Sequence, residues 1–138
     1  MMAFLNKRWL LSVYLYWWSF RKVPLIFWLR PKLIELQSQK MEIALPLTRR
    51  SKNHVSSMYL SSLVTGADLA VGVLTMFVVK ENRAKVSFIF QDIKANFYKR
   101  AMEDTHFICD QGHEIHGLIR RAMSSKKRES LQVRVQAT

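Results

Sequence analysis

The longest apolar stretch of the chain, residues 55–79, carries one charged side chain, Asp68. Its remaining residues are apolar, small or hydroxyl-bearing, and the apolar ones fall on most of the circumference of a helix. The stretch is also longer than an ordinary strand, so we predict a long buried helix over residues 56–79. Small residues at a spacing of four form a row on this helix: Ser62, Gly66 and Ala70. Such a row would let the backbone of a sheet approach closely.

Alternation of apolar and polar residues predicts strands on both sides of this helix. Residues 40–47 alternate before it, and residues 102–109 and 129–138 alternate after it. Residues 85–101 are predicted as a long strand that joins 102–109 through a short hairpin. The apolar positions of this strand change parity near Gln91, which predicts a β-bulge there.

Two further helices are predicted near the ends of the chain. Residues 1–22 are cationic and rich in aromatic side chains, but they lack the small-residue cleavage site of a signal peptide. Their apolar part is also too short to span a bilayer, which needs about 20 residues. We expect a helix that packs on its own domain or on a subunit, with contact to a membrane surface as the alternative. Two prolines favour a short helix or turn over 23–36, and residues 113–128 are predicted as an amphipathic helix.

The order of these elements indicates the fold class. A helix, a strand, a long buried helix and then further strands are typical of an α+β domain in which a sheet wraps one helix. A length of 138 residues suits one domain. We therefore predict one domain over residues 23–138, preceded by an extra N-terminal helix over 1–22.

A transmembrane helix over 55–79 is the alternative that its length allows. The first half is only weakly apolar because it is rich in serine and glycine. An Asp at the centre of a span would cost about 2.5–3.5 kcal/mol on insertion scales. We therefore favour the core helix of a globular domain.

Charge and cysteine content restrict the partners and the compartment. The formal net charge is +12, which favours anionic partners. No RNA-binding pattern of aromatic residues and glycines is present, so we expect no nucleic-acid partner. The single cysteine, Cys109, excludes an intrachain disulfide and fits a reducing compartment. We predict a cytoplasmic protein, with membrane association through residues 1–22 left open.

The surroundings of Asp68 on the predicted helix suggest a polar site. Ser61, Thr65 and Gly72 share its face, at spacings that predict the floor of a small polar cavity. Buried acids with raised pKa values concentrate at functional sites. The alternative is that Asp68 caps a loop or pairs with a basic residue inside the fold.

Residues 53–72 resemble the central-helix motif of hotdog-fold acyl-CoA thioesterases of the phenylacetic-acid-degradation type. In that motif an Asn lies six residues before a His-Gly-Gly, and a catalytic acid lies nine residues after the His. Here Asn53 lies six before Tyr59, and Asp68 lies nine after it. The resemblance to one uncharacterised subgroup of hotdog proteins extends over residues 22–138. It implies a hotdog fold, in which an antiparallel sheet wraps a long central helix.

The resemblance also implies a chemistry. The chain would hydrolyse thioesters of acyl-CoA or an acyl carrier at a site formed between subunits of a homodimer or tetramer. Asp68 would be the base or nucleophile and Asn53 would orient water or the carbonyl. The other expected site residues are Tyr59, Leu60, Ser61 and Thr65 for the substrate, and Arg49, Arg50 and Lys52 for the phosphates of coenzyme A. Coenzyme A enters only as part of the substrate, and we expect no cofactor. For the three basic residues a solvated loop is the alternative.

Two departures from the motif leave alternatives. Tyr59, Leu60 and Ser61 replace the His-Gly-Gly of the thioesterases, so the second hypothesis is a non-catalytic hotdog module that binds acyl groups or serves as an assembly surface. Hotdog sheets also usually finish with a further strand after 129–138, so we expect a truncated sequence or a sheet that is one strand short.

A metal site is a weaker candidate. Cys109, His113 and His116 are closely spaced, but the sequence has no second cluster of ligands. We therefore predict no metal site.

Overall fold

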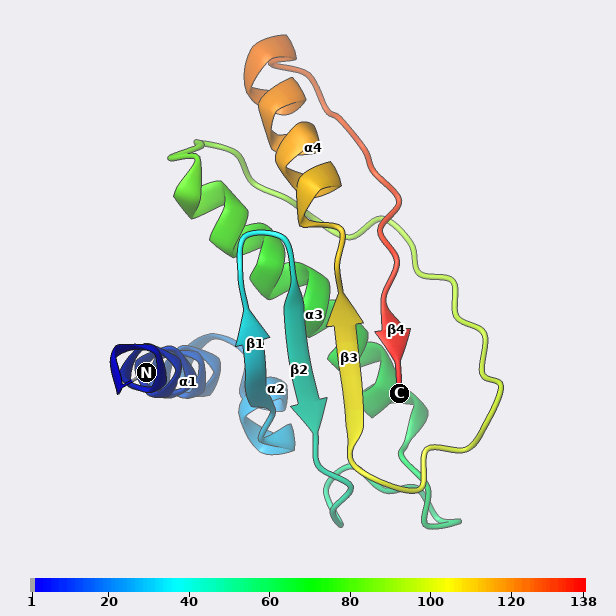
Figure 1. The fold of residues 1–138 in the computed structure, drawn as a ribbon. Helices are drawn as coiled ribbons and strands as arrows, with labels where there is room; N and C mark the ends of the chain where they lie inside the picture. The colour runs from blue at the N-terminus through cyan, green and yellow to red at the C-terminus, as the bar shows by residue number, and fades with distance from the viewer. Residues whose placement is uncertain (1) are drawn as a thin grey trace.

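The computed structural model describes residues 2–138, and the side chains from Trp9 onward. These residues form four helices and a four-stranded sheet, arranged as in Figure 1. The helices are α1 (Met2–Lys22), α2 (Pro24–Leu29), α3 (Leu60–Glu81) and α4 (Gly112–Ser125). The strands are β1 (Lys32–Leu36), β2 (Met41–Leu45), β3 (Thr105–Cys109) and β4 (Gln136–Ala137).

The sheet is antiparallel throughout and has the order β1-β2-β3-β4. The register between the two central strands places Ile43 opposite Phe107 and Ala44 opposite His106. β4 is short, and its ladder with β3 continues through paired backbone hydrogen bonds between His106 and Thr138. Figure 1 shows that α3 crosses one face of this sheet diagonally, so the sheet wraps a central helix as predicted.

Side-chain size explains how closely α3 approaches the sheet. Ser62, Gly66 and Ala70 are all buried, and a Cβ built on Gly66 would overlap the ring of Phe107. The predicted row of small residues is therefore confirmed as the contact line with the sheet. By length and composition α3 could cross a membrane, but it packs along β2 and β3. It is the core helix of the domain.

The core lies between α3, the sheet and α4. The alternation of β2 turns Met41, Ile43 and Leu45 inward, and all three are fully buried. From α4, Ile115 and Ile119 complete the same cluster. The predicted helix over 113–128 is thus confirmed, although it ends at Ser125 because Lys126 takes a left-handed conformation.

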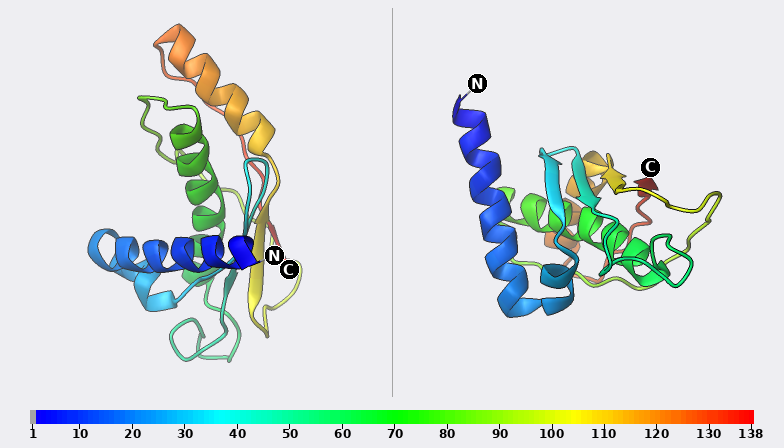
Figure 2. Two further views of the ribbon diagram at one scale, coloured as in Figure 1. Left: turned by 60° about the vertical axis from the view of Figure 1, so that its left-hand side comes forward. Right: turned by 90° about the horizontal axis from the view of Figure 1, so that it is seen from below.

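The predicted strand over 85–101 is wrong, and so are the bulge at Gln91 and the hairpin to 102–109. Residues 84–104 form no helix or strand, and Figures 1 and 2 show them sweeping round the β4 side of the domain. A strand requires a neighbour for its N–H and C=O groups, and in this chain β4 takes the place beside β3. Both parities of its apolar residues are exposed over residues 87–100, so the alternation in this segment does not correspond to a buried side.

The two ends of the sheet also differ from prediction. The prolines of 23–36 predicted only a short helix or turn. The first part of this range does form the short helix α2, but the last five residues form strand β1, which was not predicted. In the last segment, 129–138, strand β4 comprises only Gln136 and Ala137, and Thr138 extends the pairing through its bonds to His106. Its alternation is nevertheless real: Leu131, Val133 and Val135 are half-buried against the core.

The expected N-terminal helix is present as α1. Its inner side packs half-buried residues, Leu11, Leu15 and Trp18, against the core. Figures 1 and 2 place α1 beside β1, at the edge of the sheet away from β4. The division of the chain into a helix over 1–22 and a domain over 23–138 stays a prediction.

Candidate functional site

The amino end of α3 is the first part of the candidate site. The helix begins at Leu60, after Tyr59 in an extended conformation, and no side chain of the described residues caps it. The first backbone bond of the helix runs from the N–H of Leu63 to the carbonyl of Tyr59, 3.1 Å away. An uncapped first turn exposes N–H groups and the positive end of the helix dipole. The residues of this turn and its cap, Tyr59, Leu60 and Ser61, are exposed.

The loop before α3 is fixed by its own polar groups. Tyr59 N–H donates to the carbonyl of Ser51 at 2.7 Å, and Met58 N–H donates to that of Ala101 at 2.8 Å. The carboxamide of Asn53 accepts from the backbone N–H groups of Val55 and Ser57 at 3.0 and 3.1 Å. Asn53 therefore organises the loop that presents the helix end, and its amide is engaged there.

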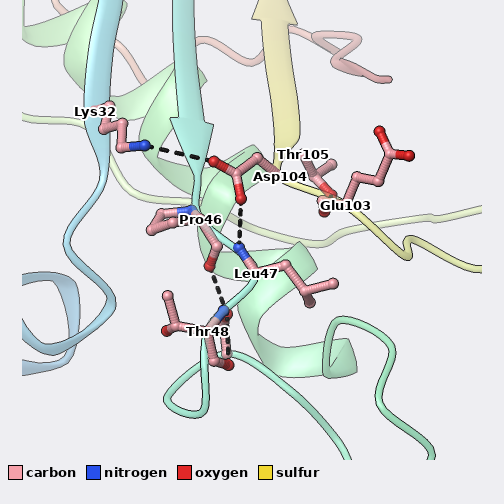
Figure 3. Close-up of polar contacts among 8 residues, drawn as sticks. Lys32, Pro46, Leu47, Thr48, Glu103, Asp104 and Thr105 are labelled. Carbon is pink, nitrogen blue, oxygen red and sulfur yellow. Dashed lines mark hydrogen bonds and ion pairs between the residues drawn. The ribbon is translucent and has the colours of Figure 1, made fainter.

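An acid from the start of β3 holds the beginning of the same loop. Figure 3 shows the carboxylate of Asp104 between two donors. It accepts from the backbone N–H of Leu47 at 2.8 Å and lies 3.4 Å from the ammonium of Lys32. The Leu47 N–H, followed by Lys32, lowers the pKa of Asp104. Sequence inspection missed this contact, because the two partners lie 57 and 72 residues away.

Asp68 lies on an exposed side of α3. Its carboxylate has no hydrogen bond and no ion pair with any side chain or backbone group that the structure describes, so it neither caps a loop nor pairs with a basic residue among them. The protein around it desolvates the carboxylate and raises its pKa. Asp68 is thus a solvent-accessible acid on the core helix with no partner in the described part of the single chain.

The expected neighbours of Asp68 share its side of the helix. The hydroxyl of Thr65 donates to the carbonyl of Ser61 at 2.7 Å, so it is engaged with its own helix. One turn further on, a Cβ built on Gly72 would lie 3.9 Å from the ring of Phe90 in the 84–104 segment. Leu60 and Asp68 are eight residues apart, which corresponds to about 12 Å along the helix axis. One chain therefore presents the helix end and the acid at separate points.

The three predicted basic residues lie in the exposed loop after β2. The guanidinium of Arg50 lies 4.7 Å from the ring centre of Trp28 on α2. Together with Arg49 these residues line an open pocket of about 450 Å³. Trp28 was not predicted, because nothing local in the sequence connects it with a loop more than 20 residues later. Lys52 forms a backbone bridge with Met58 and is exposed.

A second polar cluster joins the β1–β2 turn to the end of α3. The Nε2 of His116 lies 2.8 Å from the hydroxyl of Ser38, which donates to Glu81 at 2.7 Å. The Nδ2 of Asn82 donates to the carbonyl of Val78 and lies 3.0 Å from Nδ1 of His116. Nδ1 is therefore the acceptor and Nε2 carries the proton.

This tautomer decides what the cluster can do. A nucleophilic serine needs a basic nitrogen facing its hydroxyl, and here the ring presents an N–H to Ser38. The cluster is a structural connection. In the part of the chain that the structure describes, no group of three metal-ligating side chains converges, and Cys109 is buried.

A comparison with protein families supplies the assignment. Residues 11–138 match the model of a family described as "Domain of unknown function (DUF4442)". The chain belongs to this family. No curated protein matches it.

Solved structures share the fold of this DUF4442 protein. A "putative thioesterase" from Shewanella oneidensis superposes with a TM-score of 0.74 at 11% identity, over 100% of this chain and 88% of that one. A protein with unknown function from Chlorobaculum tepidum TLS superposes with a TM-score of 0.70 at 12% identity, over 81% of this chain and 69% of that one. At these identities the likeness shows the fold alone. The α+β hotdog fold and the resemblance to an uncharacterised hotdog group are thereby confirmed.

Proposed function

We propose that this DUF4442 protein hydrolyses thioesters of acyl-CoA or an acyl carrier, at a site built between two copies of the chain. The observation that carries the proposal is one helix with two separate reactive features. Among the described residues, no side chain caps the amino end of α3 at Leu60, and none pairs with the desolvated acid Asp68. The fold shared with a "putative thioesterase" supports it.

The separation of the two features is the reason for the second copy. About 12 Å along one helix is too far for both features to reach the same thioester. Two α3 helices that face each other in opposite directions would bring the amino end of one near Asp68 of the other. A symmetric dimer forms two such sites, because each copy supplies both features.

The surface near Asp68 is rich in exposed apolar side chains, as protein–protein interfaces are. Large apolar side chains are exposed along the segment after α3: Ile89, Phe90, Ile93, Phe97, Tyr98 and Met102. A patch of this kind on a single chain marks a contact surface. A Cβ built on Gly72 would lie 3.9 Å from the ring of Phe90, so the apolar segment passes about one helical turn from Asp68. A homodimer through this side would bury the segment and enclose the acid.

The proposed reaction uses each feature at one step. The free N–H groups and the dipole of the first turn of α3 polarise the thioester carbonyl and stabilise the negative charge that develops on its oxygen. Asp68 of the other copy takes a proton from water, whose oxygen bonds to the carbonyl carbon. The carbon–sulfur bond then breaks, and the sulfur takes the proton, so the products are a carboxylic acid and a thiol. Direct attack by the Asp68 carboxylate is the second form of the step.

Other residues take supporting parts in this proposal. Asn53 fixes the loop that presents the helix end, and Thr65 lies one turn before the acid on the same side of the helix. The exposed side chains of Tyr59, Leu60 and Ser61 would border the acyl group. Arg49, Arg50 and Lys52 would bind the phosphates of coenzyme A, since guanidinium groups pair with phosphate oxygens in bidentate geometry.

The proposed location of the protein is the cytoplasm. A reducing compartment of this kind fits a chain with a single cysteine.

One observation favours a non-catalytic role instead. Where the thioesterases have His-Gly-Gly, the side chains of Tyr59 and Leu60 are 52% and 54% exposed at the helix end. Side chains at these two positions would narrow the approach of a thioester to the N–H groups. A module that binds acyl groups or serves as an assembly surface would not need that approach.

Hydrolysis measurements on an acyl-CoA panel distinguish the two roles. Thiol release by the full chain should be lost in Asp68→Asn by about 10²-fold to 10⁴-fold, the range of general-base contributions. Asp110→Asn is the matched control, because it removes another exposed acid, and it should keep full activity. A wild-type chain that binds acyl-CoA but releases no thiol at any chain length would support the binding module and exclude the hydrolase.

A further inference from the structure

The outward side of α1 and α2 is an aromatic surface that the rest of the described chain does not cover. Seven large side chains of α1 are 39–63% exposed: Trp9, Leu10, Val13, Tyr14, Tyr16, Trp17 and Phe20. From α2, Leu25 and Trp28 are 54% and 55% exposed. We call these nine residues the aromatic surface. All four tryptophans of the chain lie in residues 9–28.

Helical geometry shows that α1 has two apolar sides with different roles. At about 100° per residue, the seven exposed side chains fall within an arc of about 160°. The opposite arc carries Leu11, Leu15, Trp18 and Ser19, which are half-buried or buried on the fold. A helix that is apolar all round is normally covered all round. α2 and β1 pack against α1, and the Phe27 ring of α2 lies 4.6 Å from that of Tyr16 and 5.0 Å from that of Phe20. The described chain covers only this margin of the aromatic surface, and the rest of the surface lacks a covering partner.

The charges around this surface indicate the kind of partner. No Asp or Glu occurs before Glu35, whereas Arg21, Lys22 and Arg30 follow the aromatic residues. The guanidinium of Arg21 lies 5.5 Å from the ring centre of Trp17, and that of Arg50 lies 4.7 Å from the ring centre of Trp28. Each pair sets a cation beside an indole at the margin of the apolar area. The partner must therefore combine an apolar interior with anionic groups at its surface.

A second copy of the chain does not meet this requirement on the same surface. Two aromatic surfaces packed face to face would bring basic margins together, with no acid from either α1 or α2 to pair with them. A bilayer that contains anionic lipids does meet it. Indole rings favour the boundary between headgroups and acyl chains, and nearby Lys or Arg residues are attracted to anionic headgroups.

We propose that the aromatic surface docks on an anionic lipid bilayer, with α1 lying in the plane of the interface and its rings among the upper acyl segments. Arg21 and Lys22 would contact headgroup phosphates. The surface extends beyond residues 1–22, because Leu25 and Trp28 of α2 belong to it. This inference is independent of the proposed hydrolase activity.

Vesicle sedimentation of the full chain tests the proposal. The wild type should sediment with phosphatidylcholine vesicles that contain phosphatidylserine, and much less with phosphatidylcholine alone. Arg21→Glu with Lys22→Glu should weaken binding at least about tenfold. Lys126→Glu with Lys127→Glu, which changes the net charge equally at exposed positions beyond α4, should leave it unchanged. Equal loss in both pairs would reduce the effect to net charge and overturn the proposal.

A second pair of variants tests the aromatic side chains themselves. Trp9→Ser with Trp17→Ser removes two exposed rings and should abolish sedimentation, whereas Met123→Ser on α4 should not change it. Circular dichroism checks that each variant is folded. The wild type also gives a reading without any variant: since all tryptophans lie in 9–28, their emission should shift to shorter wavelength on anionic vesicles.

Three results would overturn the proposal. The first is no sedimentation and no emission shift with either kind of vesicle. The second combines two observations: the wild type does not bind vesicles, and light scattering shows that the Trp9/Trp17 variant has a different oligomeric state. This result would assign the surface to a second copy of the chain. The third is binding to a nucleic acid that competes fully with vesicles and does not require Trp9 or Trp17.

Discussion

Gly66 of α3 lies directly against the ring of Phe107 on β3, with no space between them for a Cβ atom. The contact sets the distance between the helix and the sheet. Gly66→Ala should therefore lower the free energy of unfolding by about 1–3 kcal/mol, as overpacking does, although alanine is the better helix former. Urea denaturation measures the change.

A second helical glycine provides the control for this prediction. Gly117 of α4 has only the end of the Arg121 side chain near a Cβ position, at 3.4 Å. Gly117→Ala should thus raise the free energy of unfolding by about 0.5–1 kcal/mol. Equal effects of the two substitutions would contradict the close contact at Gly66.

Asp68 should destabilise the fold at neutral pH. Desolvation makes its pKa higher in the folded than in the unfolded chain, so the folded chain holds the proton more tightly. The penalty is absent at low pH, where both states are protonated, and grows as the pH rises from the unfolded pKa through the folded pKa. Asp68→Asn should therefore be more stable than the wild type at pH 7, with the difference vanishing below about pH 4. Thermal unfolding across pH checks this, and a difference that persists in acid would exclude it.

Asp104 should show the opposite pH dependence. Its pKa is lowered by the Leu47 N–H and then by Lys32, so it stabilises the fold above the unfolded pKa. This contribution should be lost as the pH falls through the folded pKa. Asp104→Asn should lower the unfolding temperature at pH 7 and have no effect in strong acid. Asp110→Asn, an exposed acid without an ion pair among the described residues, serves as the control.

Ser38→Ala should affect stability and leave catalysis intact. The hydroxyl connects His116 with Glu81, and the loss of such hydrogen bonds costs about 0.5–1.5 kcal/mol. Because His116 presents an N–H to this hydroxyl, Ser38 is not an activated nucleophile. A variant of unchanged stability that has lost thioester hydrolysis would contradict this assignment and implicate Ser38 in the chemistry.

Much of the central layer could be predicted from local spacing. The presence of α3, its row of small residues and the inward side of β2 all follow from periodicities within a few residues. The predicted range, 56–79, starts four residues before the observed helix, Leu60–Glu81, because the loop before it is held by its own hydrogen bonds. Buried side chains recur about every 3.6 residues in a helix and every second residue in a strand, so the sequence pattern reveals both the element and its buried side. The helix over 113–128 was predicted for the same reason, and its end at Ser125 depends on one backbone conformation at Lys126.

The missed features depend on partners far along the chain. Residues 85–101 alternate as a strand does, but pairing requires a free neighbour, and β4 lies beside β3 instead. The contact of Arg50 with Trp28 and that of Asp104 with Leu47 likewise join distant segments. For Asp68 the sequence predicted a polar surrounding, and the described chain shows an acid without a partner. A single sequence predicts which side of a helix or strand is apolar, but it does not show which other segment packs against that side.

The segment 84–104 has a consequence for how long an isolated chain survives. It is neither helix nor strand, and its apolar side chains are largely exposed. In a single chain its amide protons should exchange with solvent quickly and its peptide bonds should be open to proteases. Any partner that covers it would slow both processes. Resistance to digestion should therefore rise with protein concentration, and the half-life of the molecule would depend on how soon it finds another copy.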